Sequence, residues 1–230
     1  VDRYLVESFT GNAELVMHRP KPAEVVLVTG KPWEGNTSAY YTIFRDEDRL
    51  RMYYRGSHAS TDKKETHREV TCYAQSKDGV HWTKPALGLF EFNGSKKNNI
   101  ILDCRQGVAG NGAFAVFRDD SPGCDPTARY KALALYKRNG QGLYAFGSGD
   151  GIHWSLLDER PCITRGVFDS HNLAFWDGAR KRYVFFFRAH LPALDREGKA
   201  IKGTVRSVMM CTSKDFRTWS AGELVDCGDT

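Results

Sequence analysis

The chain has 230 residues, which is enough for one large domain with a packed core or for two small ones. Its 33 Lys and Arg residues exceed its 28 Asp and Glu residues only slightly, and the two signs are interspersed, so a nucleic-acid binder is not favoured. A hydrophobic fraction of 41% excludes a disordered chain. The longest aromatic and apolar run, residues 183–187, is far shorter than the roughly 20 residues that span a bilayer, which argues against a membrane protein.

From the N-terminus onward, the chain repeats a pattern of apolar runs and turns three times. Each unit has a short β-branched stretch, then an apolar-aromatic run, a turn and a second such run, with almost no helical periodicity. The three sets of runs are 25–28, 39–44 and 50–54; 100–102, 114–117 and 130–136; and 162–164, 173–176 and 183–187. Repeated units of four short strands are typical of propeller blades, so we predict an all-β propeller.

A seven-residue motif, Ser-x-Asp-x-x-x-Trp, follows the second run of each unit. Its copies are residues 76–82, 148–154 and 213–219, of which the first two also carry Gly and His. The Asp can accept backbone N–H bonds across a turn, the Gly supplies a positive φ, and the Trp packs between sheets. We therefore predict a structural role for Asp78, Asp150 and Asp215. The spacing of the histidines suggests neither a metal site nor a nucleophile.

The loops before the innermost strands are the places where a propeller can carry chemistry, because they surround one central channel. These loops are residues 32–37, 109–112 and 168–172. Two of them hold a carboxylate, Glu34 and Asp169. Two carboxylates that face one pocket suit glycosidic bond cleavage, in which one protonates the leaving oxygen and the other attacks or activates water. We predict Asp169 and Glu34 as catalytic residues, against the alternative that both only form turns.

Neighbouring polar groups suit a sugar ligand. The side chains of Asn36, Asn111, His171 and Asn172 can donate to or accept from sugar hydroxyls, and Trp33 can offer an apolar face to a sugar ring. Arg188 ends the second strand of the third unit, as Arg55 does in the first, and Lys137 is expected at the equivalent place of the second. These cations are either structural or, in the case of Arg188, substrate-binding.

The sequence resembles bacterial glycoside hydrolase family 32-like proteins, which belong with the five-bladed propellers of families 32, 43 and 117. The resemblance extends over nearly the whole chain from about Leu15 onward. The segments that carry it are residues 51–56, 76–85, 87–91, 93–95, 98–100 and 168–172. It implies a five-bladed all-β propeller, of which this chain covers about three blades and an N-terminal lead-in, and it places Asp169 where the stabilising Asp of those families is expected.

The chain departs from the family pattern in two loops. The first-blade Asp that acts as nucleophile or base has no counterpart in Glu34-Gly35-Asn36-Thr37, and Gly112-Ala113 stand where His-Asn is expected. The resemblance implies that the general acid lies on a blade beyond Thr230. It also implies that further blades, from the same polypeptide or from a partner chain, complete the ring.

We expect a lead-in over residues 1–24 and propeller units over 25–99, 100–161 and 162–230. The expected function is hydrolysis of glycosidic bonds in a plant or algal oligo- or polysaccharide, in a secreted or periplasmic bacterial protein. No cofactor, metal, nucleic acid or membrane is expected to take part. The alternative, from a different class, is a non-catalytic carbohydrate-binding or interaction propeller that has lost the acid–base pair.

Overall fold

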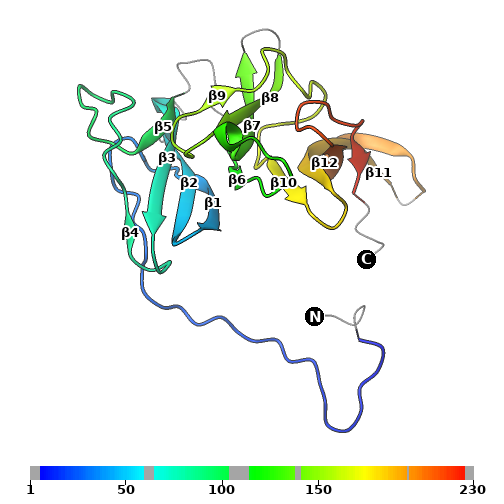
Figure 1. Ribbon diagram of the computed structural model, residues 1–230. Helices are drawn as coiled ribbons and strands as arrows, with labels where there is room; N and C mark the ends of the chain where they lie inside the picture. The colour runs from blue at the N-terminus through cyan, green and yellow to red at the C-terminus, as the bar shows by residue number, and fades with distance from the viewer. Residues whose placement is uncertain (1–5, 60–64, 104–113, 138–140, 196, 226–230) are drawn as a thin grey trace.

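The computed structural model describes residues 6–59, 65–103, 114–137, 141–195 and 197–225, and these form an all-β chain (Figure 1). The strands make three antiparallel sheets, and a 3-10 turn at Pro126–Ala128 precedes β7 in the second of them. The first sheet contains β1 (Ala39–Asp46), β2 (Arg49–Ala59), β3 (Glu65–Ser76), β4 (Trp82–Thr83) and β5 (Ile100–Asp103). The second contains β6 (Phe117–Arg118), β7 (Tyr130–Lys137), β8 (Gln141–Ser148) and β9 (Ser155–Leu156). The third contains β10 (Leu173–Asp177), β11 (Arg182–Leu194), β12 (Ala200–Ser213) and β13 (Glu223–Leu224).

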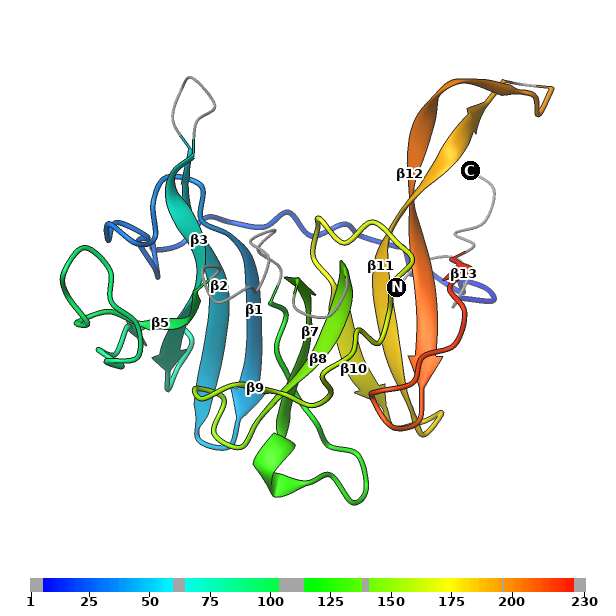
Figure 2. The same ribbon diagram turned by 90° about the horizontal axis from the view of Figure 1, so that it is seen from above.

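The three sheets stand side by side in chain order, as Figure 2 shows. β6 contacts both β1 and β10, so these three strands line the inner side of the arrangement. Over the described residues the sheets form an arc that does not close into a ring. This arrangement confirms the predicted all-β class and is consistent with propeller blades.

Hydrophobic clusters fill the two interfaces between adjacent sheets. Tyr53 and Tyr73 of the first sheet pack with Tyr144 and Phe146 of the second. Leu133 and Leu143 of the second sheet pack with Phe185 and Cys211 of the third. Because successive residues of a strand point to opposite faces, each sheet contributes alternate residues to the cluster on either side.

The repeated motif forms the turn that was predicted for it. In its first copy, Oδ1 of Asp78 accepts the backbone N–H groups of Val80 and His81 at 2.9 and 2.8 Å, and Gly79 has a φ of 83°. Asp150 and Asp215 accept the equivalent N–H groups in their own copies. The third copy lacks the Gly, and there Phe216 adopts a φ of 62°. The structural interpretation of the three Asp residues is confirmed.

The short β-branched stretches do not begin their own units as predicted. Residues 25–28 form no strand, and β5 pairs with β3 in the first sheet. Ile163 bridges to Leu143 of the second sheet. The reason is edge pairing: β4 bonds only Gln75 and Ser76 of β3, so the rest of the edge of β3 is open and β5 completes it.

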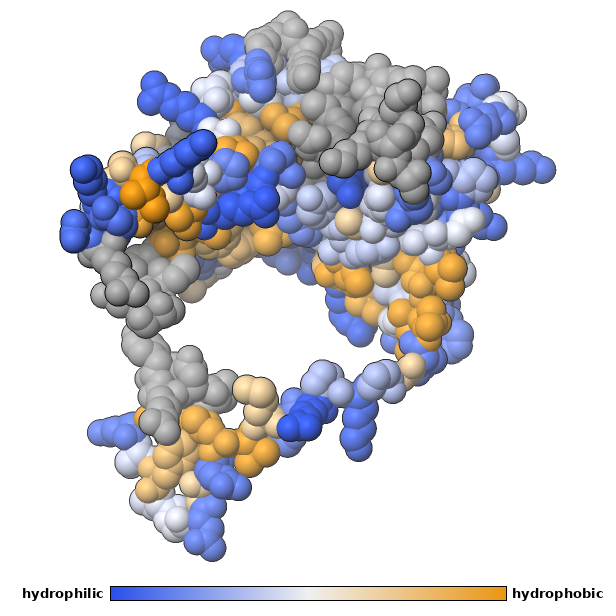
Figure 3. Space-filling model, turned by 180° about the vertical axis from the view of Figure 1, so that it is seen from behind, coloured by the Kyte–Doolittle hydropathy of each residue, from blue (hydrophilic) through white to orange (hydrophobic). Residues whose placement is uncertain are grey.

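The N-terminal segment before β1 is extended and lies apart from the sheets over much of its length (Figure 1). Seen from behind, it borders an opening on whose sheet-facing sides hydrophobic residues gather (Figure 3). Exposed apolar side chains at the two ends of the arc include Tyr41 and Ile43 on β1 and Leu173 and Phe175 on β10. No helix with the length and apolarity of a membrane span occurs in the described part of the chain.

One buried carboxylate joins each pair of adjacent sheets. Asp46, at the end of β1, accepts a bond from Arg51 of its own sheet at 2.6 Å and from the Tyr130 hydroxyl of the second sheet at 2.8 Å. Asp119, which follows β6, accepts bonds from Lys131 of its own sheet and from the Tyr183 hydroxyl of the third sheet, the latter at 2.6 Å. Burial raises the pKa of both carboxyls, but these donors outweigh it and hold each pKa below its usual range.

The Asp119–Tyr183 bond predicts a stability defect. Tyr183→Phe removes one donor from a buried carboxylate and should lower the free energy of unfolding by about 1.5–3 kcal/mol. Because the pKa of Asp119 is lower folded than unfolded, its stabilisation is present above the unfolded pKa and is lost as the pH falls through the folded one. The defect of Tyr183→Phe, measured by urea unfolding, should therefore shrink in acid. Tyr41→Phe is the control, and an equal defect there would contradict the assignment.

Candidate functional site

The candidate site lies where the loop before β10 meets the start of β1. The start of β1 is irregular: its register with β2 shifts between Ala39 and Thr42, and Tyr40 has a φ of 57°. Such bulges redirect side chains and are common beside functional sites. Here the Tyr40 ring lies 5.6 Å from the ring of His171, and Nε2 of His171 lies 3.0 Å from Oγ1 of Thr42. The bulge thus brings the first and third sheets together at His171.

Burial lowers the pKa of His171. The imidazole is therefore neutral at neutral pH, and it can donate from one nitrogen and accept at the other. This character suits a ligand hydroxyl, which both donates and accepts.

Asp169 and Arg188 form an ion pair beside His171. The Asp169 side chain is 43% exposed, whereas that of Arg188 is 16% exposed, so the pair reaches from the protein interior to solvent. Partial burial raises the pKa of Asp169, but the bond from Arg188 and the nearby positive charges outweigh this effect and hold the pKa below its usual range. The carboxyl is consequently ionised at neutral pH and is unsuited to the role of a general acid.

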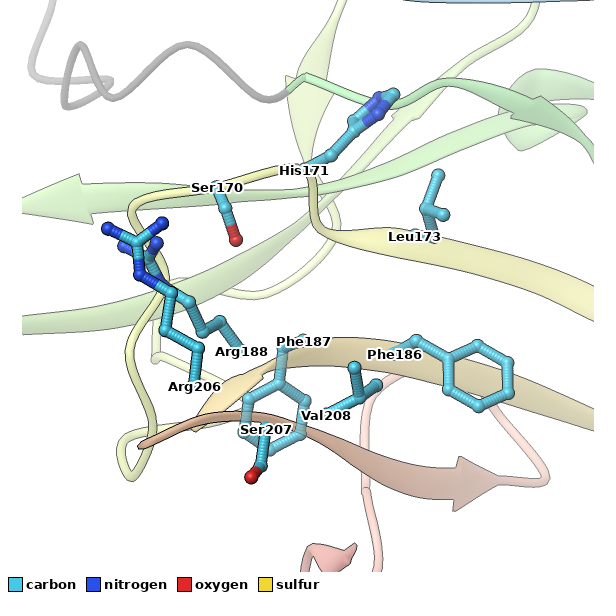
Figure 4. Close-up of a pocket in the computed structure, with 9 residues that line it drawn as sticks. All are labelled: Ser170, His171, Leu173, Phe186, Phe187, Arg188, Arg206, Ser207 and Val208. Atoms are coloured by element: carbon cyan, nitrogen blue, oxygen red, sulfur yellow. The ribbon is translucent and has the colours of Figure 1, made fainter. Parts of the chain in front are cut away.

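A pocket of about 300 Å³ adjoins this pair (Figure 4). The residues that line it are Ser170, His171, Leu173, Phe186, Phe187, Arg188, Arg206, Ser207 and Val208. In Figure 4 the two arginines and Ser170 lie at one end, whereas Leu173, Phe186 and Val208 lie at the other. The pocket therefore has a cationic, hydroxyl-bearing end and an apolar end.

Asn172 closes the loop that carries Asp169. Its side chain is buried, and its amide nitrogen donates to the backbone oxygen of Phe168 at 3.1 Å. Its amide oxygen is also buried and has no hydrogen-bond partner among the described residues. Asn172 thus shapes the loop in this structure, whereas His171 and Arg188 line the pocket.

Glu34 belongs to a buried network in the first sheet. Its side chain is fully buried; Oε1 accepts bonds from the Tyr54 hydroxyl and from Nζ of Lys84, each at 2.5 Å, and Oε2 accepts the backbone N–H of Lys31 at 2.9 Å. Nζ of Lys84 also donates to the backbone oxygen of Val28 at 2.6 Å. The carboxylate therefore anchors the loop and the N-terminal segment. Its predicted catalytic role remains a prediction.

Trp33 and Asn36 are also bound within the protein. The indole N–H of Trp33 donates to Oδ1 of Asn99 at 2.6 Å, and its ring packs edge-on against Phe92. The Asn36 amide oxygen accepts a hydrogen bond from the backbone N–H of Ala59 at 3.0 Å, and its amide nitrogen donates to the backbone oxygen of Ala59 at 2.9 Å. Both bonds hold the end of β2. Asn111 lies outside the described residues. The loop of the first sheet is thus held from several sides.

Sequence reasoning missed the residues whose role depends on pairing between strands. Tyr40, Lys84 and Arg206 were not singled out as site residues, because only the tertiary structure places them at these contacts. The strand register also corrects one expectation, that Lys137 is the equivalent of Arg55 and Arg188. In each sheet one residue pairs with the Ser of the repeated motif, and these residues are Leu50, Tyr130 and Tyr183. The position five residues later is Arg55 in the first sheet, Arg188 in the third and Leu135, not Lys137, in the second.

No group of three or more His, Cys, Asp or Glu side chains that could hold a metal ion occurs in the part of the chain that the structure describes.

No protein-family model and no curated protein matches the chain. Among solved structures it is similar to a glycosyl hydrolase from Bacteroides ovatus, with 16% identity, a TM-score of 0.45, and coverage of 80% of this chain and 50% of that one. It is also similar to sucrose-6-phosphate hydrolase from Lactobacillus gasseri, with 14% identity, a TM-score of 0.49, and coverage of 85% and 35%. The chain thus spans about half the length of the first structures that it matches.

The buried Glu34–Lys84 ion pair predicts that the stability of the fold depends strongly on the Lys84 ammonium group. Lys84→Met leaves the Glu34 carboxylate buried without its cation and should lower the free energy of unfolding by about 3–5 kcal/mol, as measured by urea unfolding. The double variant Glu34→Gln/Lys84→Met should lose clearly less, because a neutral amide is cheaper to bury. Lys77→Met is the matched surface control. Equal losses in the single and double variants would refute the pairing.

Proposed function

We propose that the chain belongs to a carbohydrate-active β-propeller that hydrolyses glycosidic bonds of a plant or algal oligo- or polysaccharide. The observation that carries the proposal is the ionised Asp169 carboxylate, held by Arg188 beside a pocket with both polar and apolar walls. A sugar presents hydroxyl edges and an apolar ring face. Ser170 and His171 suit the hydroxyls, and Leu173 and Phe186 suit the ring.

In this proposal Asp169 stabilises positive charge that develops on the sugar. Glycoside hydrolysis passes through an oxocarbenium-like transition state, and a fixed carboxylate near the ring lowers its energy. The depressed pKa of Asp169 supports this role over that of the acid. Glu34 is left in its structural role, because its carboxylate is fully buried and bonded to Lys84 and Tyr54.

We further propose that additional antiparallel sheets, from the same polypeptide or a partner chain, pack against the two ends of the arc. The support is the position of the exposed apolar residues. Phe175, which lies outside the pocket, occupies the register position that Phe44 occupies in the first sheet, where Phe44 stacks on Tyr130 of the second sheet. On the third sheet Phe175 is instead more than 40% exposed.

The function is tested with the 230-residue chain and a panel of plant and algal oligosaccharides, by measuring reducing-end release and, separately, binding by calorimetry. Asp169→Asn should lower turnover by about 10²- to 10³-fold, the effect of removing a preorganised transition-state charge, while substrate binding is retained. Asp158→Asn, which alters an Asp–Arg pair outside the pocket, is the control.

Two outcomes decide against this mechanism. Binding without turnover by the unaltered chain on every glycan would support the non-catalytic carbohydrate-binding alternative. Absence of both binding and turnover would contradict a carbohydrate-active protein altogether.

A further inference from the structure

The β2–β3 and β11–β12 hairpins have the same register from Leu50 to Gly56 and from Tyr183 to Ala189, so these residues can be compared position by position; beyond them the register of β2–β3 shifts between Gly56 and His58. Leu50 pairs with Ser76 in the first, and Tyr183 pairs with Ser213 in the third sheet. Counting from these pairs, Arg55 faces Thr71 and Arg188 faces Val208. Arg55 and Arg188 therefore occupy equivalent positions. The diagonal residue, two positions before each partner in the sequence, is Glu69 in the first sheet, where the register shifts, and Arg206 in the third, where it is regular.

In the first sheet the diagonal pair is neutralised. Arg55 lies 3.3 Å from the carboxylate of Glu69, and both side chains are largely buried. Arg55 also donates to the backbone oxygen of Thr37 at 3.0 Å and lies over the Tyr40 ring. This arginine is therefore held by groups of its own sheet.

In the third sheet the same diagonal carries two cations. Residues 188 and 206 lie on the same face of the hairpin and line the same pocket, and His190 is directly opposite Arg206. The charges of the two guanidinium groups repel each other. Arg188 pairs with Asp169, but Arg206 forms no hydrogen bond or ion pair with any described residue. Two guanidinium groups therefore line the pocket, and one carboxylate, that of Asp169, pairs with them.

We propose that this pocket binds the anionic group of an acidic saccharide, either the carboxylate of a uronic acid or a sulfate ester, through Arg206 together with Arg188. The inference rests on the proposed carbohydrate function and specifies its substrate class. Guanidinium groups bind carboxylate and sulfate oxygens through paired N–H donors. The hydroxyls of Ser170 and Ser207 can add bonds to the same group, and Phe186 offers the sugar ring an apolar face (Figure 4).

The test compares charged and neutral ligands of the same size by isothermal calorimetry on the 230-residue chain. The probes are trigalacturonic acid, its methyl ester, 6-sulfated galactotriose and unmodified galactotriose. We expect at least one charged probe to bind about 10- to 100-fold more tightly than its neutral counterpart, the effect of a charge-assisted hydrogen bond. This preference should weaken between about 50 and about 500 mM NaCl, because salt screens exposed charges. The two charged arms distinguish a carboxylate from a sulfate.

Variants distinguish an effect of Arg206 itself from an effect of the overall positive charge of the chain. Arg206→Gln should remove the preference for the charged probe and leave binding of the neutral probe unchanged. Arg206→Glu, which places a carboxylate on the same face as Arg188, should also remove it while raising the thermal midpoint of unfolding. Lys202→Gln, an exposed cation on the same strand, should change neither.

The outcomes distinguish this inference from the proposed function on which it rests. Equal binding of charged and neutral probes, or a preference that survives Arg206→Gln, would overturn the acidic-saccharide inference but leave a carbohydrate site standing. Absence of binding for all four probes and for the whole glycan panel would instead overturn the carbohydrate function itself.

Discussion

The buried carboxylates of Asp46 and Asp119 are bonded on both sides of an interface between sheets, and the arrangement of the molecule depends on them. Each carboxylate accepts one hydrogen bond from a cationic side chain of its own sheet and another from a tyrosine hydroxyl of the next sheet. A charge in this position is stable only when its partners are held in place, because an unpaired buried carboxylate costs several kcal/mol, of the order of 3–5. The two bonds therefore fix how adjacent sheets pack, and with that the distance between the inner strands β1, β6 and β10.

That packing brings together side chains from opposite ends of the arc. His171 of the third sheet reaches Thr42 and Tyr40 of the first only because the starts of β1 and β10 converge. Within the resulting site the ionisable groups differ in charge for identifiable reasons: burial keeps His171 neutral, whereas Arg188 keeps Asp169 ionised. A neutral imidazole beside a fixed carboxylate suits hydroxyl recognition and charge stabilisation better than proton donation.

The repeated hairpin shows how one backbone arrangement supports different chemistry. The equivalent diagonal holds Arg55 with Glu69 in the first sheet and Arg188 with Arg206 in the third, and Leu135 takes the arginine position in the second. Hydrogen-bonded register fixes where these side chains lie, and it is indifferent to their charge. The first position is consequently a closed ion pair that stabilises the sheet, the second is part of the core, and the third leaves a cation available to a ligand.

Local sequence was sufficient for the features that depend on a few neighbouring residues. The apolar runs predicted the all-β class and the strands β1, β2, β7, β10 and β11, whereas β3, β8 and β12 were not among these runs. The Ser-x-Asp-x-x-x-Trp motif predicted turns whose Asp side chains accept backbone N–H groups. Local sequence also drew attention to His171 and Arg188, which line one pocket, and to Asp169, which pairs with Arg188 beside it. Pairing between distant segments decided the rest. Residues 100–103 joined the first sheet because the edge of β3 was open, Glu34 and Trp33 found buried partners in Lys84 and Asn99, and Arg206 came to lie beside Arg188. Which long-range partner a polar side chain meets depends on strand register and on packing between sheets, and a linear pattern of residue types does not encode either one.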